Sequence, residues 1–189
     1  MIRIGILGDI GSGKSYVAKN FGYPVFNADF EVGKLYKKDK KIFNKIKKIL
    51  PKYIYSFPIS KNEISNAILA NKPNLKKIVK IVHLEIRKKM NTFLSKNKNK
   101  KIVILDIPLL LENKINKEND ILVFVKSKKI DVLNRLKKRN SFNPKLLNKF
   151  KKIQLPLNYK MKKSQFIIKN DFTKKSVKMG VKKIINEIL

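Results

Sequence analysis

The chain has 189 residues and a formal net charge of +33, from 46 Lys and Arg against 13 Asp and Glu. Hydrophobic residues make up 43% of it, too many for a disordered polyelectrolyte, and the absence of Cys excludes disulfide scaffolds, thiolate zinc sites and Cys nucleophiles. No apolar run approaches the roughly 18 residues that span a bilayer, and no signal peptide is recognisable, so we expect a single, soluble, cytoplasmic domain.

The N-terminal end predicts a buried strand over residues 2–7, where an apolar run is ended by a glycine. The turn that follows, Gly8-Asp-Ile-Gly-Ser-Gly-Lys-Ser15, matches the pattern G-x-x-x-x-G-K-S/T, and a helix is expected over 14–21. In such a loop the glycines let backbone N–H groups surround a phosphate, Lys14 neutralises the terminal phosphates, and the Ser15 hydroxyl binds Mg²⁺. We therefore predict that ATP and Mg²⁺ bind here.

A second short strand is expected over 24–27, and Asp29 follows just past its end. We expect this carboxylate across the crevice from Lys14, where it can accept the proton of an acceptor hydroxyl during phosphoryl transfer. Asp is also a good helix N-cap, so a structural role for Asp29 is the alternative.

The stretch 40–97 contains three predicted helices and no strand, and it is too long for one crossover helix. These helices are expected over 40–50, 62–70 and 74–96. We interpret the stretch as a helical substrate-binding insert. In its longest helix His83 and Arg87 lie one turn apart and share a face that can bind an anionic substrate. For His83 taken alone, an ordinary packed or surface histidine is the favoured interpretation.

The clearest strand is expected over residues 102–106, a continuous apolar run that ends in Asp106. An acid at this end of a parallel strand can hold the metal with its water shell, and the alternative is an exposed aspartate that caps the next turn. The remaining elements are strands over 120–125 and 166–168 and helices over 129–139 and 173–189, with a small lid at 140–164.

Strands that alternate with helices predict an α/β fold of the P-loop NTPase type, a parallel sheet flanked by helices. Its nucleotide-binding core is expected to comprise 1–39, 98–139 and 165–189, so that the whole chain is one kinase domain with a helical insert and a lid.

Four Arg stand among 42 Lys, which makes each of them informative. Arg139, at the end of the helix expected over 129–139, is predicted to bind the transferring phosphates with its planar guanidinium. Arg3 is interpreted as a plain surface residue.

Taken in order, these motifs resemble the dephospho-CoA kinase family along nearly the whole chain. The most specific match is Asp106-Ile-Pro-Leu-Leu-Leu-Glu112, close to the family's Asp-x-Pro-Leu-Leu-Phe-Glu. Asn27-Ala-Asp29 is similar to its Asp-Ala-Asp, and His83 with Arg87 resembles its His-Pro-x-x-Arg. Further matches follow the lid and adenine-end patterns of the family: Arg135 to Arg139, Gln154-Leu-Pro156, Lys160 and Ile168-Lys-Asn170.

The resemblance implies ATP-dependent phosphorylation of the ribose 3′-hydroxyl of dephospho-CoA, the last step of coenzyme A biosynthesis, with catalysis by Asp29, Lys14 and Arg139. It implies ATP contacts from Gly8, Gly11, Ser12, Gly13, Lys14, Ser15, Tyr16, Arg139 and Asn170, and metal contacts from Ser15 and Asp106. It implies substrate contacts from Asp29, His83, Arg87, Pro108, Leu109, Leu110 and Glu112, with the 40–97 insert binding the CoA precursor.

The chain also departs from the family pattern. Asp9 stands where the family has Gly, Tyr16 where it usually has Thr, and Asn27 where it has the first Asp of Asp-Ala-Asp. Leu84 follows His83 in place of Pro, no Gly follows Asn170, and the lid lacks the family's Arg before its Gln-Met-Pro run.

Two other functions fit parts of the sequence. Another small-molecule kinase, acting on a nucleoside, nucleotide or sugar, would share the phosphate loop, but the Asp106–Glu112 motif argues against it. A basic nucleic-acid-binding protein would explain the charge, but Lys, Asn and Ile are enriched together, as A/T-rich codons produce. We therefore expect ATP and dephospho-CoA as partners, a monomer, no membrane, and only non-specific, salt-sensitive binding to nucleic acid.

Overall fold

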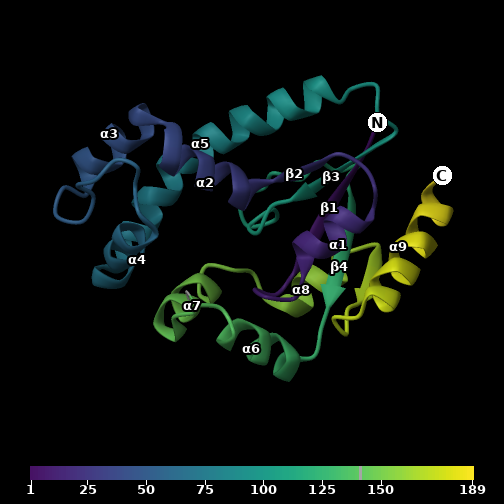
Figure 1. Ribbon diagram of the computed structural model, residues 1–189. Helices are drawn as coiled ribbons and strands as arrows, with labels where there is room; N and C mark the ends of the chain where they lie inside the picture. The colour runs from purple at the N-terminus through teal and green to yellow at the C-terminus, as the bar shows by residue number, and fades with distance from the viewer. Residues whose placement is uncertain (141) are drawn as a thin grey trace. The chain divides into compact units, whose positions relative to one another are not determined.

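The computed structural model describes residues 1–140 and 142–189, so Ser141, which falls within the predicted lid, lies outside the described residues. It contains a parallel sheet of five strands in the order β2-β3-β1-β4-β5 (Figure 1). The strands are β1 (Ile2–Gly8), β2 (Val25–Asn27), β3 (Ile102–Asp106), β4 (Ile121–Lys126) and β5 (Phe166–Lys169). All five lie where the sequence predicts a strand, and the predicted α/β fold is confirmed.

The chain divides into two compact units. The first comprises Met1–Asn27, Asn97–Asn143 and Lys149–Leu189, and the second comprises Ala28–Lys96 and Pro144–Asn148. The first unit holds the sheet with helices α1 (Lys14–Asn20), α6 (Lys129–Lys137), α8 (Leu157–Lys162) and α9 (Lys174–Ile188). The second holds α2 (Ala28–Lys38), α3 (Lys40–Ile49), α4 (Lys61–Ala70) and α5 (Lys72–Lys96), and the boundary between the units falls within α7 (Pro144–Lys151).

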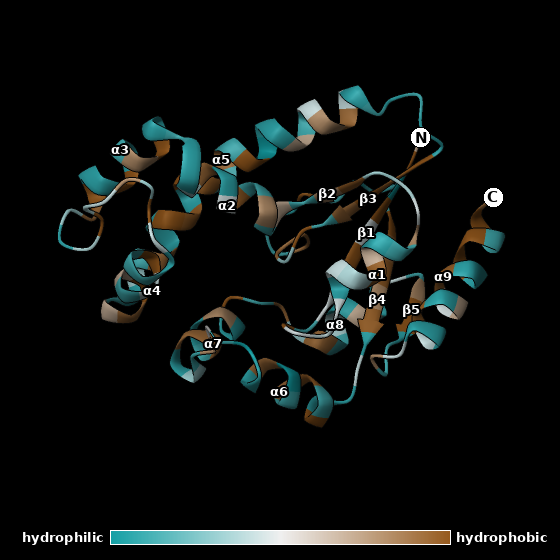
Figure 2. Ribbon diagram, in the orientation of Figure 1, coloured by the Kyte–Doolittle hydropathy of each residue, from teal (hydrophilic) through white to brown (hydrophobic). Residues whose placement is uncertain are grey.

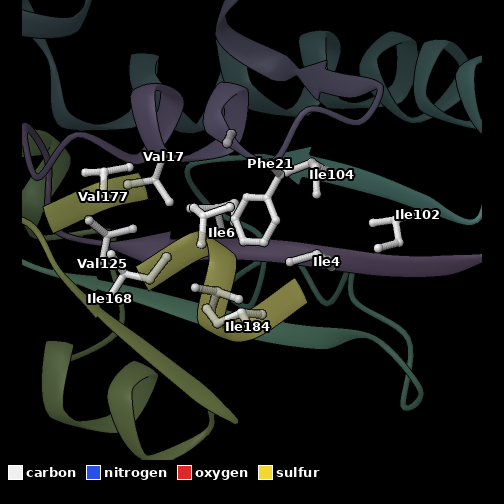
Figure 3. Close-up of a cluster of buried hydrophobic side chains, with 13 residues drawn as sticks. Ile4, Ile6, Val17, Phe21, Ile102, Ile104, Val125, Ile168, Val177 and Ile184 are labelled. Atoms are coloured by element: carbon white, nitrogen blue, oxygen red, sulfur yellow. The ribbon is translucent and has the colours of Figure 1, made fainter. Parts of the chain in front are cut away.

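The core of the first unit lies between one face of the sheet and the helices α1 and α9 (Figure 3). Val17 of α1, Phe21 at its C-terminal end and Ile184 of α9 pack against Ile6 of β1 and Ile168 of β5. All five are at most 3% exposed. Each buried side chain of this size contributes about 1.5–3 kcal/mol. In Figure 2, β1 and β4 are brown while α9 alternates between brown and teal, as expected for buried strands and an amphipathic helix.

The opposite face of the sheet is covered near its centre by the loop that follows β3. Leu110 of this loop is completely buried, and its Cδ2 would lie 2.5 Å from a Cβ placed at Gly5 of β1. Gly5 therefore makes room for Leu110 at the middle of the sheet.

The interpretation of Arg3 as a surface residue is wrong. Arg3 is 8% exposed, its Nη2 donates to Asp120 Oδ2 at 2.9 Å, and its Nε lies 2.9 Å from Oδ1 of the same carboxylate. Asp120 also accepts a hydrogen bond from the backbone N of Lys117. A charged residue inside an apolar strand is buried only when it is paired, and here the partner stands at the start of the neighbouring strand.

The second unit is helical, as predicted, and α5 is its longest helix. The buried apolar side chains of α5 recur at helical spacing: Leu75, Ile78, Val82, Ile86 and Met90. The unit begins at Ala28, ahead of the insert predicted from residue 40, because it includes α2, a helix that the sequence did not predict. Among the described residues, no helix is long and apolar enough to cross a membrane.

Candidate active site

The phosphate loop joins β1 to α1, with a strand before it and a helix after it, as predicted. Three of its glycines have positive φ angles: 146° at Gly8, 86° at Gly11 and 92° at Gly13. At Gly13 two features exclude a side chain: the positive φ angle, and the collision that a Cβ would make with Nδ2 of Asn170. The loop conformation therefore depends on glycine, which is what the sequence pattern requires.

Lys14 and Asp9 both bond to the backbone of the loop. The Lys14 ammonium donates to the carbonyl oxygen of Asp9 at 2.7 Å and to that of Gly8 at 3.2 Å. The Asp9 carboxylate accepts from the backbone N of Ile10 at 2.7 Å, so this acid, which departs from the family pattern, is hydrogen-bonded within the loop itself. The positive charge of Lys14 is thereby held over the loop that would surround a phosphate.

Three polar side chains meet where α1 begins and where β2 and β3 end. Asn27 lies beside Asp106 in the strand register, and its Nδ2 donates to Asp106 Oδ2 at 2.5 Å and to Ser15 Oγ at 3.4 Å. Asp106 is 3% exposed, so the alternative of an exposed capping aspartate is wrong. From the sequence alone Asn27 is visible only as a departure from the family, whereas the strand register pairs it with Asp106.

These side chains fit a magnesium ion. A hydroxyl, a carboxylate and an amide are oxygen donors of the kind that Mg²⁺ prefers, and this ion commonly keeps waters and substrate phosphates as its other ligands. The described residues contain no group of three or more His, Cys, Asp or Glu that could hold a metal. Ser15 and Asp106 are therefore suited to a phosphate-bound Mg²⁺ and not to an ion held by protein alone.

Asn170 supports the loop from the end of β5. It is 3% exposed, its backbone N donates to Lys126, and its Nδ2 donates to the carbonyl oxygen of Ser12 at 2.8 Å. The Ser127 hydroxyl donates to the same carbonyl at 3.1 Å. Asn170 thus holds the backbone of the phosphate loop, and its contact with ATP stays a prediction. Tyr16, also predicted to contact ATP, is partly buried against the core of the first unit.

Of the two arginines near α6, Arg135 is the one that approaches the loop. Its Nη1 would lie 3.4 Å from a Cβ placed at Gly13. Arg139 lies beyond the end of α6 at Lys137, not inside a helix that continues to residue 139 as predicted. In the described part of the chain its hydrogen bonds are backbone ones, to Leu136 and from Phe142.

The loop after β3 carries four of the predicted substrate contacts. Pro108 and Leu109 are partly exposed, whereas Leu110 has no exposed surface with which to contact a ligand. Glu112 lies 2.5 Å from the ammonium of Lys160 and accepts a hydrogen bond from the backbone N of Leu155 at 2.9 Å. Both carboxylate and ammonium are shielded from water, with side-chain exposures of 9% and 1%. Leu110 and Glu112 therefore shape the loop from within.

The other predicted residues belong to the second unit. Burial lowers the pKa of His83, and the positive charge of Arg87, one turn along α5, lowers this pKa further. His83 is therefore partly buried and close to Arg87, as expected for one helix face. Asp29 is exposed in the first turn of α2, which begins at Ala28, so the alternative of Asp29 as the N-cap is wrong.

Comparison with known proteins gives a consistent result. A family model described as dephospho-CoA kinase matches residues 2–176. The dephospho-CoA kinase of Wolbachia pipientis wMel is 36% identical to this chain, and that of the Wolbachia strain from Brugia malayi is 35% identical; each match covers 98% of this chain and 97% of the relative.

Solved structures agree with the fold. A crystal structure from Thermus thermophilus superposes with a TM-score of 0.79 at 24% identity, covering 100% of this chain and 98% of that one. The dephospho-CoA kinase of Campylobacter jejuni superposes with a TM-score of 0.62 at 22% identity, covering 98% and 96%.

Proposed function

The chain belongs to the dephospho-CoA kinase family, and we propose that it transfers the γ-phosphoryl group of ATP to the ribose 3′-hydroxyl of dephospho-CoA, yielding coenzyme A and ADP. One observation carries the proposal beyond the likeness itself. The phosphate loop and Asp106, which ends β3, are joined through the Asn27 amide at one end of the sheet. This is the end at which α/β sheets bind their ligands.

The residues of the first unit act on ATP. The loop backbone and Lys14 bind the β- and γ-phosphates, and Arg139 stabilises the charge that builds up on the transferring group. Ser15 and Asp106 would hold Mg²⁺, which neutralises phosphate charge and orients the γ-phosphoryl group. In the reaction the acceptor oxygen forms a bond to the γ-phosphorus, and the bond from that phosphorus to the leaving ADP oxygen breaks.

Asp29 accepts the proton that the 3′-hydroxyl loses. A carboxylate is suited to this step because it orients the hydroxyl in the ground state and takes its proton as the new bond forms. Asp29 is the second residue after β2, so the chain itself keeps it close to Asn27, which donates a hydrogen bond to Asp106. Asp29 is exposed to solvent.

The CoA precursor binds through the helical insert at 40–97 and the loop after β3, with 140–164 acting as a lid. His83, Arg87, Pro108 and Leu109 contact the precursor directly. Leu110 and Glu112 act on it only through the shape of the loop, because their side chains are buried or paired. The precursor carries anionic groups, and the face of α5 that holds Arg87 is suited to bind such groups.

The composition of the chain bears on its cellular location and its binding partners. A chain without Cys whose substrates are ATP and a CoA precursor is compatible with the reducing cytoplasm. We expect a monomer with no dedicated nucleic-acid or membrane partner. Binding to nucleic acid through the +33 charge would be electrostatic, non-specific and lost at high salt.

The test is a coupled assay of ADP release with dephospho-CoA as the acceptor, alongside nucleoside monophosphates, nucleosides and sugars. We expect ADP release with dephospho-CoA and a product phosphorylated at the 3′-oxygen. Phosphorylation of a nucleoside monophosphate but not of dephospho-CoA would contradict the proposal. Binding to RNA that persists at high salt, without ATP turnover, would instead favour a nucleic-acid-binding protein.

Lys14→Ala tests the phosphate loop in the same assay. Loss of the ammonium should lower kcat by about 10²-fold or more, because the charge that develops on the phosphoryl oxygens loses a fixed cation. Lys19→Ala is the matched control, since Lys19 is an exposed lysine on the same helix, and it should leave kcat unchanged. Equal kinetics for the two variants would remove the loop from the mechanism.

A further inference from the structure

Asp9 places a carboxylate inside the phosphate loop, directly after its first glycine, Gly8. A side chain at this position could extend into the solvent. Instead, its Oδ1 accepts a hydrogen bond from the backbone N of Ile10 at 2.7 Å, and the residue is partly buried. The carboxylate therefore lies against the backbone of the loop, and its negative charge belongs to the loop itself.

This charge has no ion-pair partner. Among residues 1–140 and 142–189, the ion pairs join other acids to lysines and arginines, and none includes the Asp9 carboxylate. The Lys14 ammonium donates to the backbone carbonyl oxygen of Asp9, at 2.7 Å. In a chain with 46 lysines and arginines, the loop thus contains an acid whose charge is not compensated by an ion pair.

The shape of the loop keeps this charge close to any phosphate that the loop binds. Gly8 and Gly11, on either side of Asp9, have positive φ angles of 146° and 86°, which curve the backbone around the space for the ligand. Two negative charges at short range repel each other, and water screens the repulsion less where one of them is partly buried. Asp9 therefore opposes the attraction that Lys14 and the backbone N–H groups exert on a phosphate.

The overall charge of the chain gives this opposition a function. A field of +33 speeds the arrival of ATP, but it also attracts ADP, which must leave after each turnover. A negative charge within the loop lowers the affinity at the place where the phosphates bind. It leaves the long-range field almost unchanged, because it alters only one of many charges.

We propose that Asp9 sets the affinity of the phosphate loop for nucleotides: its charge weakens the binding of ATP and ADP and thereby accelerates the release of ADP. The inference rests on the proposed function to the extent that ATP occupies the loop and ADP is a product. Asp9 takes no part in the transfer of the phosphoryl group, so its effect is on binding and release.

The experiment measures dissociation constants for Mg²⁺-ATP and Mg²⁺-ADP by calorimetry. Asp9→Asn removes the charge but keeps an oxygen that can accept from Ile10, so both nucleotides should bind about tenfold more tightly than in the unaltered protein. The gain should shrink when the salt concentration is raised from about 0.05 M to about 0.5 M, because salt screens the repulsion that the variant removes. Unchanged or weaker binding of ATP by Asp9→Asn would overturn the proposal.

Two further variants separate charge from loop structure. Asp9→Ala removes both the charge and the acceptor for Ile10, and it too should bind ATP more tightly. Normal affinity in Asp9→Asn with reduced affinity in Asp9→Ala would show that the carboxylate only supports the loop. Asp39→Asn is the matched control: the Asp39 carboxylate accepts from the backbone N of Ile42 at the start of α3, Asn is an equally good cap, and neither nucleotide's affinity should change.

The release of ADP is measured directly by stopped flow, with a fluorescent ADP analogue displaced by excess ATP. Asp9→Asn should release the analogue about tenfold more slowly, since differences in affinity between related complexes lie mostly in the dissociation rate. Tighter binding that came entirely from faster association would contradict a role in release.

Failure of this inference is distinguishable from failure of the proposed function, because no acceptor is present in these measurements. An unaltered protein that bound neither nucleotide would refute the phosphate site itself. One that bound both nucleotides but did not phosphorylate dephospho-CoA would refute only the acceptor. Equal affinities in Asp9→Asn and the unaltered protein would refute only the role of Asp9.

Discussion

At the scale of single residues, Asn27 and Asp29 have different surroundings at the end of β2. The Asn27 side chain is engaged with Asp106 and Ser15, whereas Asp29 extends exposed from the first turn of α2. The uncharged amide at position 27 can donate to Asp106, which a carboxylate could not do without a proton. In the proposed function, Asp29 is the acid at this strand end that receives the proton of the acceptor hydroxyl.

Asp29→Asn should therefore reduce turnover of dephospho-CoA by about 10²-fold or more, because the amide cannot accept the proton during transfer. The affinity for ATP should change little, since none of the residues that bind phosphate is altered. Steady-state kinetics and ATP titration check the two parts separately.

Glu31→Gln is the matched control, since it removes one carboxylate from the same first turn of α2, where Glu31 is paired with Lys34 and Lys89. This control should keep nearly normal turnover. Normal turnover in Asp29→Asn itself would exclude Asp29 from the mechanism.

At this scale, the sequence predicts a functional site where the residues of that site are consecutive in the chain. The phosphate loop was predictable because glycines and a lysine at fixed spacing permit essentially one backbone path. The roles of Arg3 and Asn27 were not predictable, because their partners, Asp120 and Asp106, come close to them only through strand order and register. The positive φ angle of Phe172 was equally invisible, since no rule of sequence places a bulky residue there.

At the scale of elements, the ion pair between Glu112 and Lys160 connects the loop after β3 to α8. Breaking it on one side leaves a buried, unpaired charge, so Glu112→Gln should destabilise the protein by about 3 kcal/mol in urea unfolding. Adding Lys160→Met should restore much of the loss, because the uncompensated ammonium is then gone. Glu187→Gln, which alters an exposed pair with Lys183, should change stability by no more than about 0.5 kcal/mol.

The same double variant decides between two roles for Glu112. If the carboxylate supports the loop, as its contacts with Lys160 and Leu155 indicate, the variant should keep its KM for dephospho-CoA nearly unchanged. If this KM rose strongly although stability was restored, Glu112 would contact the substrate directly, as the family resemblance implies.

The start of α4 makes stability depend on pH. Burial alone would raise the pKa of Glu63, but hydrogen bonds from Tyr55, Ser56 and Ser60 outweigh it and hold this pKa at about 2, below its ordinary value of 4.5. A depressed pKa stabilises the folded state above the unfolded value and loses that effect as the pH falls from 4.5 towards 2.

Urea unfolding at about pH 6 should show Glu63→Gln less stable than the unaltered protein by on the order of 2 kcal/mol. The gap should narrow as the solution is acidified, because the unaltered protein then loses its carboxylate bonds. A gap that stayed constant down to about pH 3 would contradict this assignment.

Elements were predictable in proportion to how strongly their own sequence specifies them. Strand β3 is a continuous apolar run up to Asp106, and α5 repeats its apolar positions over 25 residues. Helix α2 was missed because it has Gly33 in its interior and only two buried side chains. Helices α7 and α8, of eight and six residues, are too short to form without tertiary contacts, so local pattern could not reveal them.

At the scale of the whole molecule, a charge of +33 acts on substrates that are both polyanions. Most lysines are solvent-exposed. Lys160 is 1% exposed, and its buried ammonium is paired with Glu112. A field of this sign accelerates the encounter with ATP and dephospho-CoA without contributing to the chemical step. The expected signature is therefore a salt effect on kcat/KM and not on kcat.

Raising the salt concentration from about 0.05 M to about 0.5 M should lower kcat/KM roughly tenfold and leave kcat nearly constant, because screening shortens the reach of the field. A variant with Lys174, Lys175 and Lys182 replaced by Gln removes three exposed charges of α9. It should show a shallower salt dependence with the same kcat. If kcat/KM were independent of salt in both proteins, the excess of lysine would be a matter of composition alone, as its joint enrichment with Asn and Ile would also produce.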